Sequence, residues 1–336
     1  MASQTRTVSV FGVTGSQGGS VVRSLLKDKV SNFKVRGITR ATASENARAL
    51  QGLGVELAKA DGWNQDEVRD AVAGSWAVFV NTNSDDPIFR SPEGPTEFDL
   101  GKSMIDGIRA ANVKNLVLSS LRPAAEGTGG KLAIKTMDMK ARIEEYAKHT
   151  GGFDTISSVH AGWYYEIFLS EMVAQLHRGF PYFPDAEGYL SLHLPRWGAA
   201  EDEGVPFLST RDDFGDLVHG ILLDPEAWNG KGVQGVSNVC SLPRFVEIFS
   251  QVTGKKARYV RLASWECLGD GIAEMEDHRL LFAYGNITGG RYFGQQPSST
   301  ETAASLKIQA ARAQGIFGDD AQLTTPAAFF AKHFPQ

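Results

Sequence analysis

Apolar and polar residues form two patterns that alternate along the first half of the chain and predict strands and helices in turn. Short apolar runs bounded by Gly, Asp or Asn are typical of buried strands. Longer stretches such as 18–27, with Val22, Leu25 and Leu26 on one face, predict amphipathic helices. The predicted strands are 8–13, 33–39, 55–59, 76–80, 116–119 and 153–159, and the predicted helices are 18–27, 44–53, 64–73, 95–111 and 136–149.

This strict alternation of strands and helices predicts the fold class. Parallel strands need long crossover connections, and a helix between each pair of strands supplies them. We therefore expect an α/β fold in which residues 1–160 form a doubly wound parallel sheet.

The regular alternation of strands and helices ends after about residue 160, so the second half is expected to be organised differently. Residues 180–207 mix aromatics, Pro and Gly, which favours irregular loops, whereas 256–263 alternates like a strand. Helical patterns recur near 213–223 and 242–253. We expect residues 161–336 to form a smaller mixed α/β lobe for a substrate or partner, with segments that pack back on the sheet.

The first predicted strand leads into the sequence VSVFGVTGSQGG at residues 8–19, with glycines at 12, 15 and 18. In a dinucleotide-binding turn the first glycine permits the tight turn, the second lets the backbone approach the diphosphate, and the third lets helix and strand pack closely. The free N–H groups at the helix start then face the anion. We therefore expect residues 1–160 to be a Rossmann domain that binds a dinucleotide. The alternative is an ordinary glycine-rich turn.

The end of the second predicted strand, KVRGITR at 34–40, bears on the choice of cofactor. An NAD site usually has Asp or Glu there, to bind the ribose 2′-hydroxyl. This strand ends in Thr39 and Arg40, and a guanidinium suits a 2′-phosphate. NADP(H) is therefore the expected cofactor, unless Arg40 is a solvated loop residue and the site accepts both.

Composition excludes several other classes of protein. Hydrophobic content of 42% and charged content of 22% are ordinary for a soluble globular protein, and the net charge of −5 argues against direct nucleic-acid binding. Two cysteines without a CxxC motif, no signal peptide and no membrane-length apolar run favour a cytoplasmic protein. The scattered histidines lack metal-binding spacing, so no metal is expected.

Several segments together resemble the NmrA-like proteins, which are atypical short-chain dehydrogenases related to the isoflavone reductases. The resemblance rests on VFGVTGSQGGSV, VRGITR, AVFVNTN, KTMDMKARIEEY, FDTISSVHAGWYYEIF and STRDDFGDLV, in this order. It spans most of residues 7–220 and fades toward the C-terminus.

The resemblance implies a role for each matching residue. Gly12, Gly15, Gln17 and Gly18 would line the diphosphate within a loop that Thr14 and Ser16 complete. Arg40 would bind the 2′-phosphate and Asp61 would lie near the adenine. Asn81 and Thr82 would lie over the ribose and nicotinamide, which Ser119 and Lys140 would approach. Asn81 and Thr82 could instead simply end a strand.

The catalytic apparatus departs from the usual short-chain dehydrogenase pattern of Tyr four residues before Lys. None of the eight tyrosines has Lys four residues later, and Thr136 stands where the Tyr would be, before Lys140. A Thr hydroxyl is too weak an acid to replace a phenol. Lys140 is therefore the candidate catalytic residue, or it only binds the ribose.

Two functions of different classes remain open. The first is an NADPH-dependent reductase of a small organic carbonyl, imine or activated alkene. Trp163, Tyr164 and Tyr165 would then line the substrate pocket, although these aromatics could equally be core. The second is a non-catalytic redox sensor whose cofactor state alters binding to a transcription factor or other protein partner.

Overall fold

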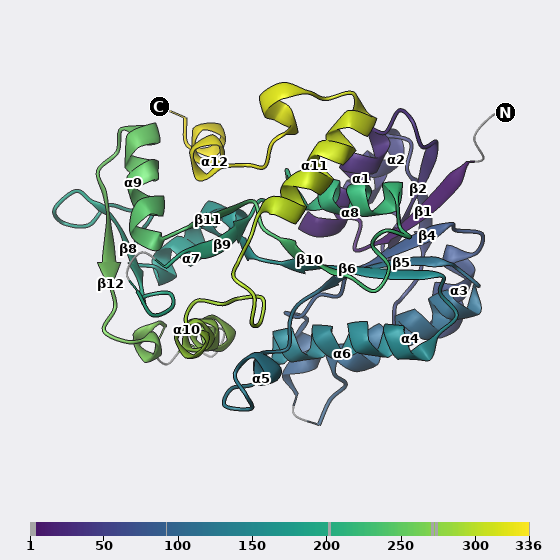
Figure 1. Cartoon of the computed structure of the whole chain (residues 1–336), viewed down its shortest axis with the longest axis horizontal. Coiled ribbons are helices and arrows are strands. Elements are labelled where there is room, and N and C mark those ends of the chain that lie inside the picture. The colour runs from purple at the N-terminus through teal and green to yellow at the C-terminus, as the bar shows by residue number, and fades with distance from the viewer. Residues whose placement is uncertain (1–4, 92, 201–202, 270–271, 273–274, 336) are drawn as a thin grey trace.

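The central feature is a parallel sheet of seven strands in the order β10-β6-β5-β4-β1-β2-β3 (Figure 1). The structure is a computed structural model that describes residues 5–91, 93–200, 203–269, 272 and 275–335. The strands are β1 (Arg6–Phe11), β2 (Phe33–Thr39), β3 (Glu56–Lys59), β4 (Ala77–Val80), β5 (Asn115–Ser120), β6 (Thr155–Ala161) and β10 (Gly232–Gly235). Strand order reverses direction between β1 and β4, and ligands bind at such a switch point. The predicted doubly wound fold is confirmed.

Helices cover both faces of this sheet, as Figure 1 shows. Along β5 the side chains alternate, so that Leu116 and Leu118 pack on one side and Val117 on the other. No helix in the described ranges combines the length and apolar character of a membrane span. One face carries α3 (Gln65–Val72), α4 (Glu97–Ala110) and α6 (Lys135–Thr150), and the other α1 (Ser16–Leu26), α2 (Glu45–Gly52), α8 (Phe214–Leu223) and α11 (Glu301–Gln314).

Local chemistry explains where the elements begin and end. The predicted strand 8–13 stops at Phe11 because Gly12 turns the chain with a φ of 64°. The following helix accordingly starts at Ser16, two residues earlier than predicted. Ser44 caps α2 as predicted, since its side chain accepts the N–H of Ala47.

Many elements of the second half lie beyond the carboxyl ends of the strands and form a lobe, at the left of Figure 1. Its core is largely aromatic, and Phe207 and Phe245 stack with centroids 4.6 Å apart. Its elements are β7 (Trp163–Tyr164), α7 (Glu171–Leu176), β8 (Leu190–Leu194), β9 (Val205–Leu208), β11 (Asn238–Cys240), α9 (Leu242–Thr253), β12 (Ala257–Arg261), α10 (Glu276–Thr288) and α12 (Pro326–His333). From the same half, β10 joins the central sheet beside β6.

The interpretation of residues 180–207 as irregular loops was wrong. The segment contains β8 and the start of β9, because LSLHL alternates apolar and polar residues and VPFL is wholly apolar. Leu190, Leu192 and Leu194 are buried in the lobe core. The strand predicted within 256–263 is confirmed as β12, and it pairs with β8 in parallel.

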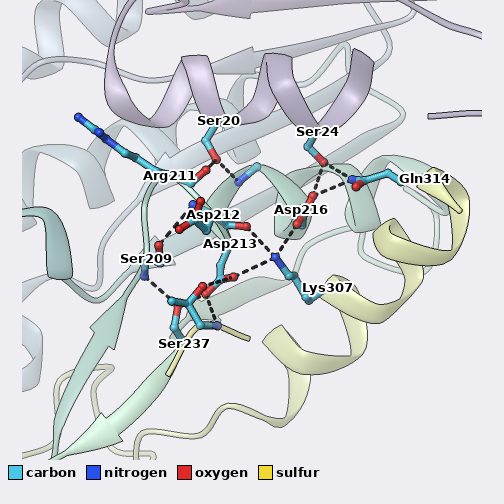
Figure 2. A network of polar contacts seen from close by, with 12 residues as sticks. Ser20, Ser24, Ser209, Arg211, Asp212, Asp213, Asp216, Ser237, Lys307 and Gln314 are labelled. Carbon is cyan, nitrogen blue, oxygen red and sulfur yellow. Dashed lines mark hydrogen bonds and ion pairs between the residues drawn. The ribbon is translucent and has the colours of Figure 1, made fainter. Parts of the chain in front are cut away.

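A buried polar network joins α1, α8 and α11 (Figure 2). Lys307 on α11 pairs with Asp213 at 3.0 Å and Asp216 at 2.8 Å. Asp216 also accepts hydrogen bonds from Ser24 on α1, at 2.5 Å, and from Gln314, at 2.8 Å. Because Lys307, Asp213 and Asp216 are each paired with an opposite charge, these contacts fix α1 against the C-terminal half.

The contact between α1 and α8 depends on glycine. A Cβ on Gly215 would lie 2.1 Å from the carbonyl oxygen of Ser20, whereas one on Gly52 in α2 would meet nothing within 4 Å. We expect Gly215→Ala to lower the free energy of unfolding by about 1–3 kcal/mol, because the helices must separate. The matched control Gly52→Ala should leave it unchanged or raise it by up to about 1 kcal/mol. Urea denaturation of both variants checks this, and equal stabilities would contradict it.

Candidate functional site

The glycine-rich turn at the end of β1 is built to bring backbone close to a ligand. The N–H of Gly15 donates to the carbonyl oxygen of Gly12 at 2.9 Å. A Cβ on Gly18 would lie 2.3 Å from that same oxygen, so only glycine fits there. Gly15 is the N-cap of α1 and has no side chain to accept the first N–H groups of the helix. These N–H groups are therefore available to an anion.

A cavity of about 450 Å³ opens beside this turn, between the ends of β1, β2 and β4. Arg40 lies exposed at the end of β2, and within the described ranges its guanidinium has no ion pair. The predicted cofactor residues that line this cavity are Gly12, Thr14, Arg40, Asp61, Asn81 and Thr82. The residues predicted to bind the ribose, the adenine and the 2′-phosphate therefore surround one cavity.

Gln17 connects the turn to the lobe. Its amide nitrogen donates to the hydroxyl of Tyr164 at 2.8 Å. Its amide oxygen is buried and has no partner among the described residues. Buried polar atoms are nearly always hydrogen-bonded, so this orphaned acceptor is a place where a ligand donor could bind.

Lys140 lies on α6 at the carboxyl edge of the sheet and is only 9% exposed. Its ammonium donates to the carbonyl oxygen of Thr82 at 2.9 Å, to the Thr82 hydroxyl at 3.1 Å and to Glu97 Oε1 at 2.8 Å. Glu97 is 2% exposed and also accepts from the Thr82 hydroxyl at 2.5 Å and from Ser84 at 3.0 Å. The carboxylate of Glu97 and the ammonium of Lys140 thus form a buried ion pair.

Glu97 was missed by the sequence analysis. It stands in the first turn of α4, where Thr96 and Asp99 form a capping box. An acidic residue in a first helical turn is usually explained by the helix dipole, so its pattern gave no sign of a distant partner. Glu97 and Lys140 are 43 positions apart in the sequence, and only the parallel packing of α4 and α6 brings them together.

The two residues at the end of β5 differ in their contacts. Ser119 is buried at the penultimate position of the strand. Ser120 donates to the backbone carbonyl of Lys140 at 3.3 Å and so ties α6 to the strand end. Thr136, at the position of the usual catalytic tyrosine, donates to Asp277 of α10. The Thr136 hydroxyl is therefore engaged by the lobe.

The three predicted pocket aromatics lie in different surroundings. Tyr165 is fully buried and stacks on Phe207 and Phe329 in the lobe core, with centroids 5.3 and 5.0 Å away. Trp163 is 6% exposed and packs edge-on against the same core. Tyr164 faces the glycine-rich turn through Gln17. Burial raises the pKa of Tyr164 above its ordinary value, and the carboxylates of Glu166 and Asp85 raise it further.

Comparison with known proteins shows which family the sequence matches. The sequence model of the NmrA-like family matches residues 4–288. Among relatives, the NmrA-like family domain-containing oxidoreductase cpsB of Aspergillus campestris is 50% identical over 331 residues, which cover 98% of this chain and 97% of the relative.

Solved structures share the fold. NmrA, described as a negative transcriptional regulator, has been solved with NADP and matches with a TM-score of 0.69 at 21% identity, covering 94% of this chain and 96% of that chain. The NADPH-dependent quinone oxidoreductase QOR2 of Escherichia coli, solved with NADPH, matches with a TM-score of 0.68 at 18% identity. That match covers 97% of this chain and 99% of the other. NmrA has also been solved with NAD, so one such fold accepts either dinucleotide.

The buried ion pair makes a prediction about stability that is independent of any ligand. We expect Glu97→Leu to lower the free energy of unfolding by about 3–5 kcal/mol, because it leaves the buried ammonium of Lys140 without its counter-charge. The double variant Glu97→Leu/Lys140→Met should recover most of this loss. Guanidinium denaturation of the two single variants and the double variant gives the coupling free energy, and purely additive losses would contradict it.

Proposed function

This chain belongs to the NmrA-like family, and we propose that it is an NADPH-dependent reductase of a small organic carbonyl, imine or activated alkene. The observation that carries the proposal is the position of Thr82. It lines the cavity that contains Arg40, and it also accepts two hydrogen bonds from the buried Lys140. A dinucleotide with its 2′-phosphate at Arg40 would therefore extend toward the ammonium.

The residues present fit NADP(H). The turn from Gly12 to Gly18 offers close backbone and unpaired N–H groups to a diphosphate. The orphaned amide oxygen of Gln17 is suited to a ligand hydroxyl or amide. Arg40 would bind the 2′-phosphate, and Asp61 and Asn81 would face the adenosine and the ribose. When bound, NADPH would supply the hydride.

Lys140 would hold the ribose and supply the proton that the reduced substrate atom needs. A general acid must lie within reach of the atom that it protonates, and Lys140 donates to Thr82, which lines the cavity that contains Arg40. Glu97 also fixes the position of Nζ, so the ammonium needs little reorganisation. Because Thr82 and Glu97 already accept its three N–H groups, one of these bonds must be exchanged for the ligand.

Tyr164 is a weaker candidate for the proton donor. In a tyrosine-dependent reductase a neighbouring cation lowers the pKa of the phenol. Here burial and the carboxylates of Glu166 and Asp85 raise the pKa of Tyr164. We propose instead that Tyr164 forms part of the wall of the substrate pocket, next to Gln17. Trp163 and Tyr165 would support that wall from the core.

A specific observation also favours the second candidate, a non-catalytic redox sensor acting on a protein partner. All three donors of Lys140 are satisfied within the protein, and the hydroxyl of Thr136 is bonded to Asp277. In a sensor, the same residues would bind the dinucleotide but would transfer no proton. Turnover with a small molecule distinguishes the two candidates.

We expect the chain to bind NADPH more tightly than NADH, through Arg40. Arg40→Ala should weaken NADPH binding by roughly 10- to 150-fold and leave NADH binding nearly unchanged, since only NADPH has the 2′-phosphate. Arg48→Ala, a charge change on the exposed side of α2, is the matched control. Calorimetric titration checks this, and equal weakening toward both cofactors would exclude the 2′-phosphate role.

If the chain is a reductase, Lys140→Met should lower turnover by roughly 10²- to 10⁴-fold, the usual effect of losing a general acid, with only a modest loss of NADPH binding. Tyr164→Phe should retain most activity. The measurement is NADPH oxidation across a panel of quinones, ketones, imines and enones.

Two outcomes would change the assignment. Normal turnover by Lys140→Met with an inactive Tyr164→Phe would transfer the proton donor to the tyrosine. Binding of NADPH by the wild-type chain without oxidation by any member of the panel would support the sensor.

A further inference from the structure

A second cavity, of about 410 Å³, borders the glycine-rich turn from the side of α8 and α12. It shares Thr14 with the cavity that contains Arg40, so the same turn separates the two spaces. Its lining consists of Thr14, Gly15, Ser16, Arg23, Arg211, Asp212 and Lys332. Three cationic side chains from three separate segments thus converge beside the first turn of α1, with one carboxylate among them.

The backbone of Arg211 is held rigidly. Its N–H donates to Glu166 Oε1 at 2.8 Å, and its carbonyl oxygen accepts from the Ser20 hydroxyl at 3.1 Å and from Arg23 at 3.2 Å. Figure 2 shows the Arg211 side chain leaving the buried network and extending past Ser20, away from Ser24 and hence toward the N-terminal end of α1. Its guanidinium makes no hydrogen bond or ion pair within the described ranges. A fixed backbone therefore presents an unused cation at the start of α1.

Lys332 neutralises the one carboxylate in this lining. Its ammonium lies 2.7 and 2.8 Å from the two carboxylate oxygens of Asp212. Without that contact, Asp212 would repel an anion placed between Gly15 and Arg211. Lys332 belongs to α12, which lies outside the residues 4–288 that match the family. The last helix of the chain thus adds a third cation to this lining.

We propose that Arg211 binds the diphosphate of the dinucleotide from the side opposite Arg40, and that Lys332 makes this possible by screening Asp212. The inference rests on the proposed function and adds residues from the C-terminal half to the cofactor site. Arg23 contributes charge but is tied to the carbonyl of Arg211. The exposed guanidinium of Arg211 and the uncapped N-terminus of α1, with Gly15 as N-cap, face the same cavity and both favour an anion.

The test compares ligands that share only part of the dinucleotide. NADPH and NADH both contain the diphosphate, whereas adenosine 2′-monophosphate lacks it and keeps the adenosine and the phosphate that Arg40 would bind. We expect Arg211→Ala to weaken NADPH and NADH equally, by roughly 10- to 100-fold, and to leave adenosine 2′-monophosphate unchanged. Arg211→Lys should recover part of the loss. Arg244→Ala, which removes an exposed arginine paired with Glu247 on α9, is the matched control.

The screening role of Lys332 is tested by a double-variant cycle. Lys332→Ala should weaken both dinucleotides by roughly 3- to 10-fold, and Lys332→Ala/Asp212→Asn should restore wild-type affinity, because the unpaired carboxylate is then gone. Arg211 and Lys332 are exposed, so thermal unfolding should be unchanged in both variants.

Different results would overturn this inference and the proposed function. If Arg40→Ala weakens NADPH while Arg211→Ala binds both dinucleotides like wild type, the diphosphate is held by the turn alone and the inference is overturned. If the wild-type chain binds neither dinucleotide, both fail. Loss of adenosine 2′-monophosphate binding in Arg211→Ala would show a general disturbance of the site and would also overturn the inference.

Discussion

The close approach of α1 to its neighbours is the constraint on which the site depends. A Cβ at Gly18 would lie 2.3 Å from the backbone of the turn, and one at Gly215 would lie 2.1 Å from the backbone of α1. Both contacts join backbone to backbone, so a larger residue cannot be accommodated by a side-chain rotation. The first turn of α1 is therefore fixed against β1 on one side and α8 on the other. The two cavities that meet at Thr14 take their shape from this arrangement.

Two buried lysines show how similar interactions serve different ends. Lys307 is paired with Asp213 and Asp216 between helices on one face of the sheet, where it fastens α11 to α8. Lys140 is paired with Glu97 on the other face, beside a residue that lines a cavity. Removing a buried charge from water is costly unless it is paired, so both pairs are integral to the fold. Only the second lies where a ligand could exchange with one of its hydrogen bonds.

Features that depend on neighbouring residues could be predicted from the sequence. The strand and helix periods gave the parallel sheet, and the glycine spacing gave the turn around Gly12. Contacts between distant segments could not be predicted in this way. Glu97 has the pattern of an ordinary acidic residue in a first helical turn. Arg211 and Lys332 are far apart in the sequence, and only the tertiary fold brings them to one cavity. Tyr165 fits a pocket and a core equally well by sequence, and its stacking shows that it lies in the core.

The irregular composition of residues 180–207 shows a related difficulty. Pro, Gly and aromatic residues obscured the short strands β8 and β9, whose partners lie up to 67 positions away. Strand pairing of this kind is decided by tertiary contacts more than by intrinsic preference. The outline of the first half was therefore predictable, while the strands of the lobe could be located only in the structure.

A crystal structure of the chain with NADPH tests the central claim most directly. We expect the diphosphate on the N–H groups of the first turn of α1, the 2′-phosphate at Arg40, and the nicotinamide ribose within hydrogen-bond distance of Lys140 Nζ. A dinucleotide bound away from the turn, or one whose nicotinamide ribose lies far from Lys140, would contradict it.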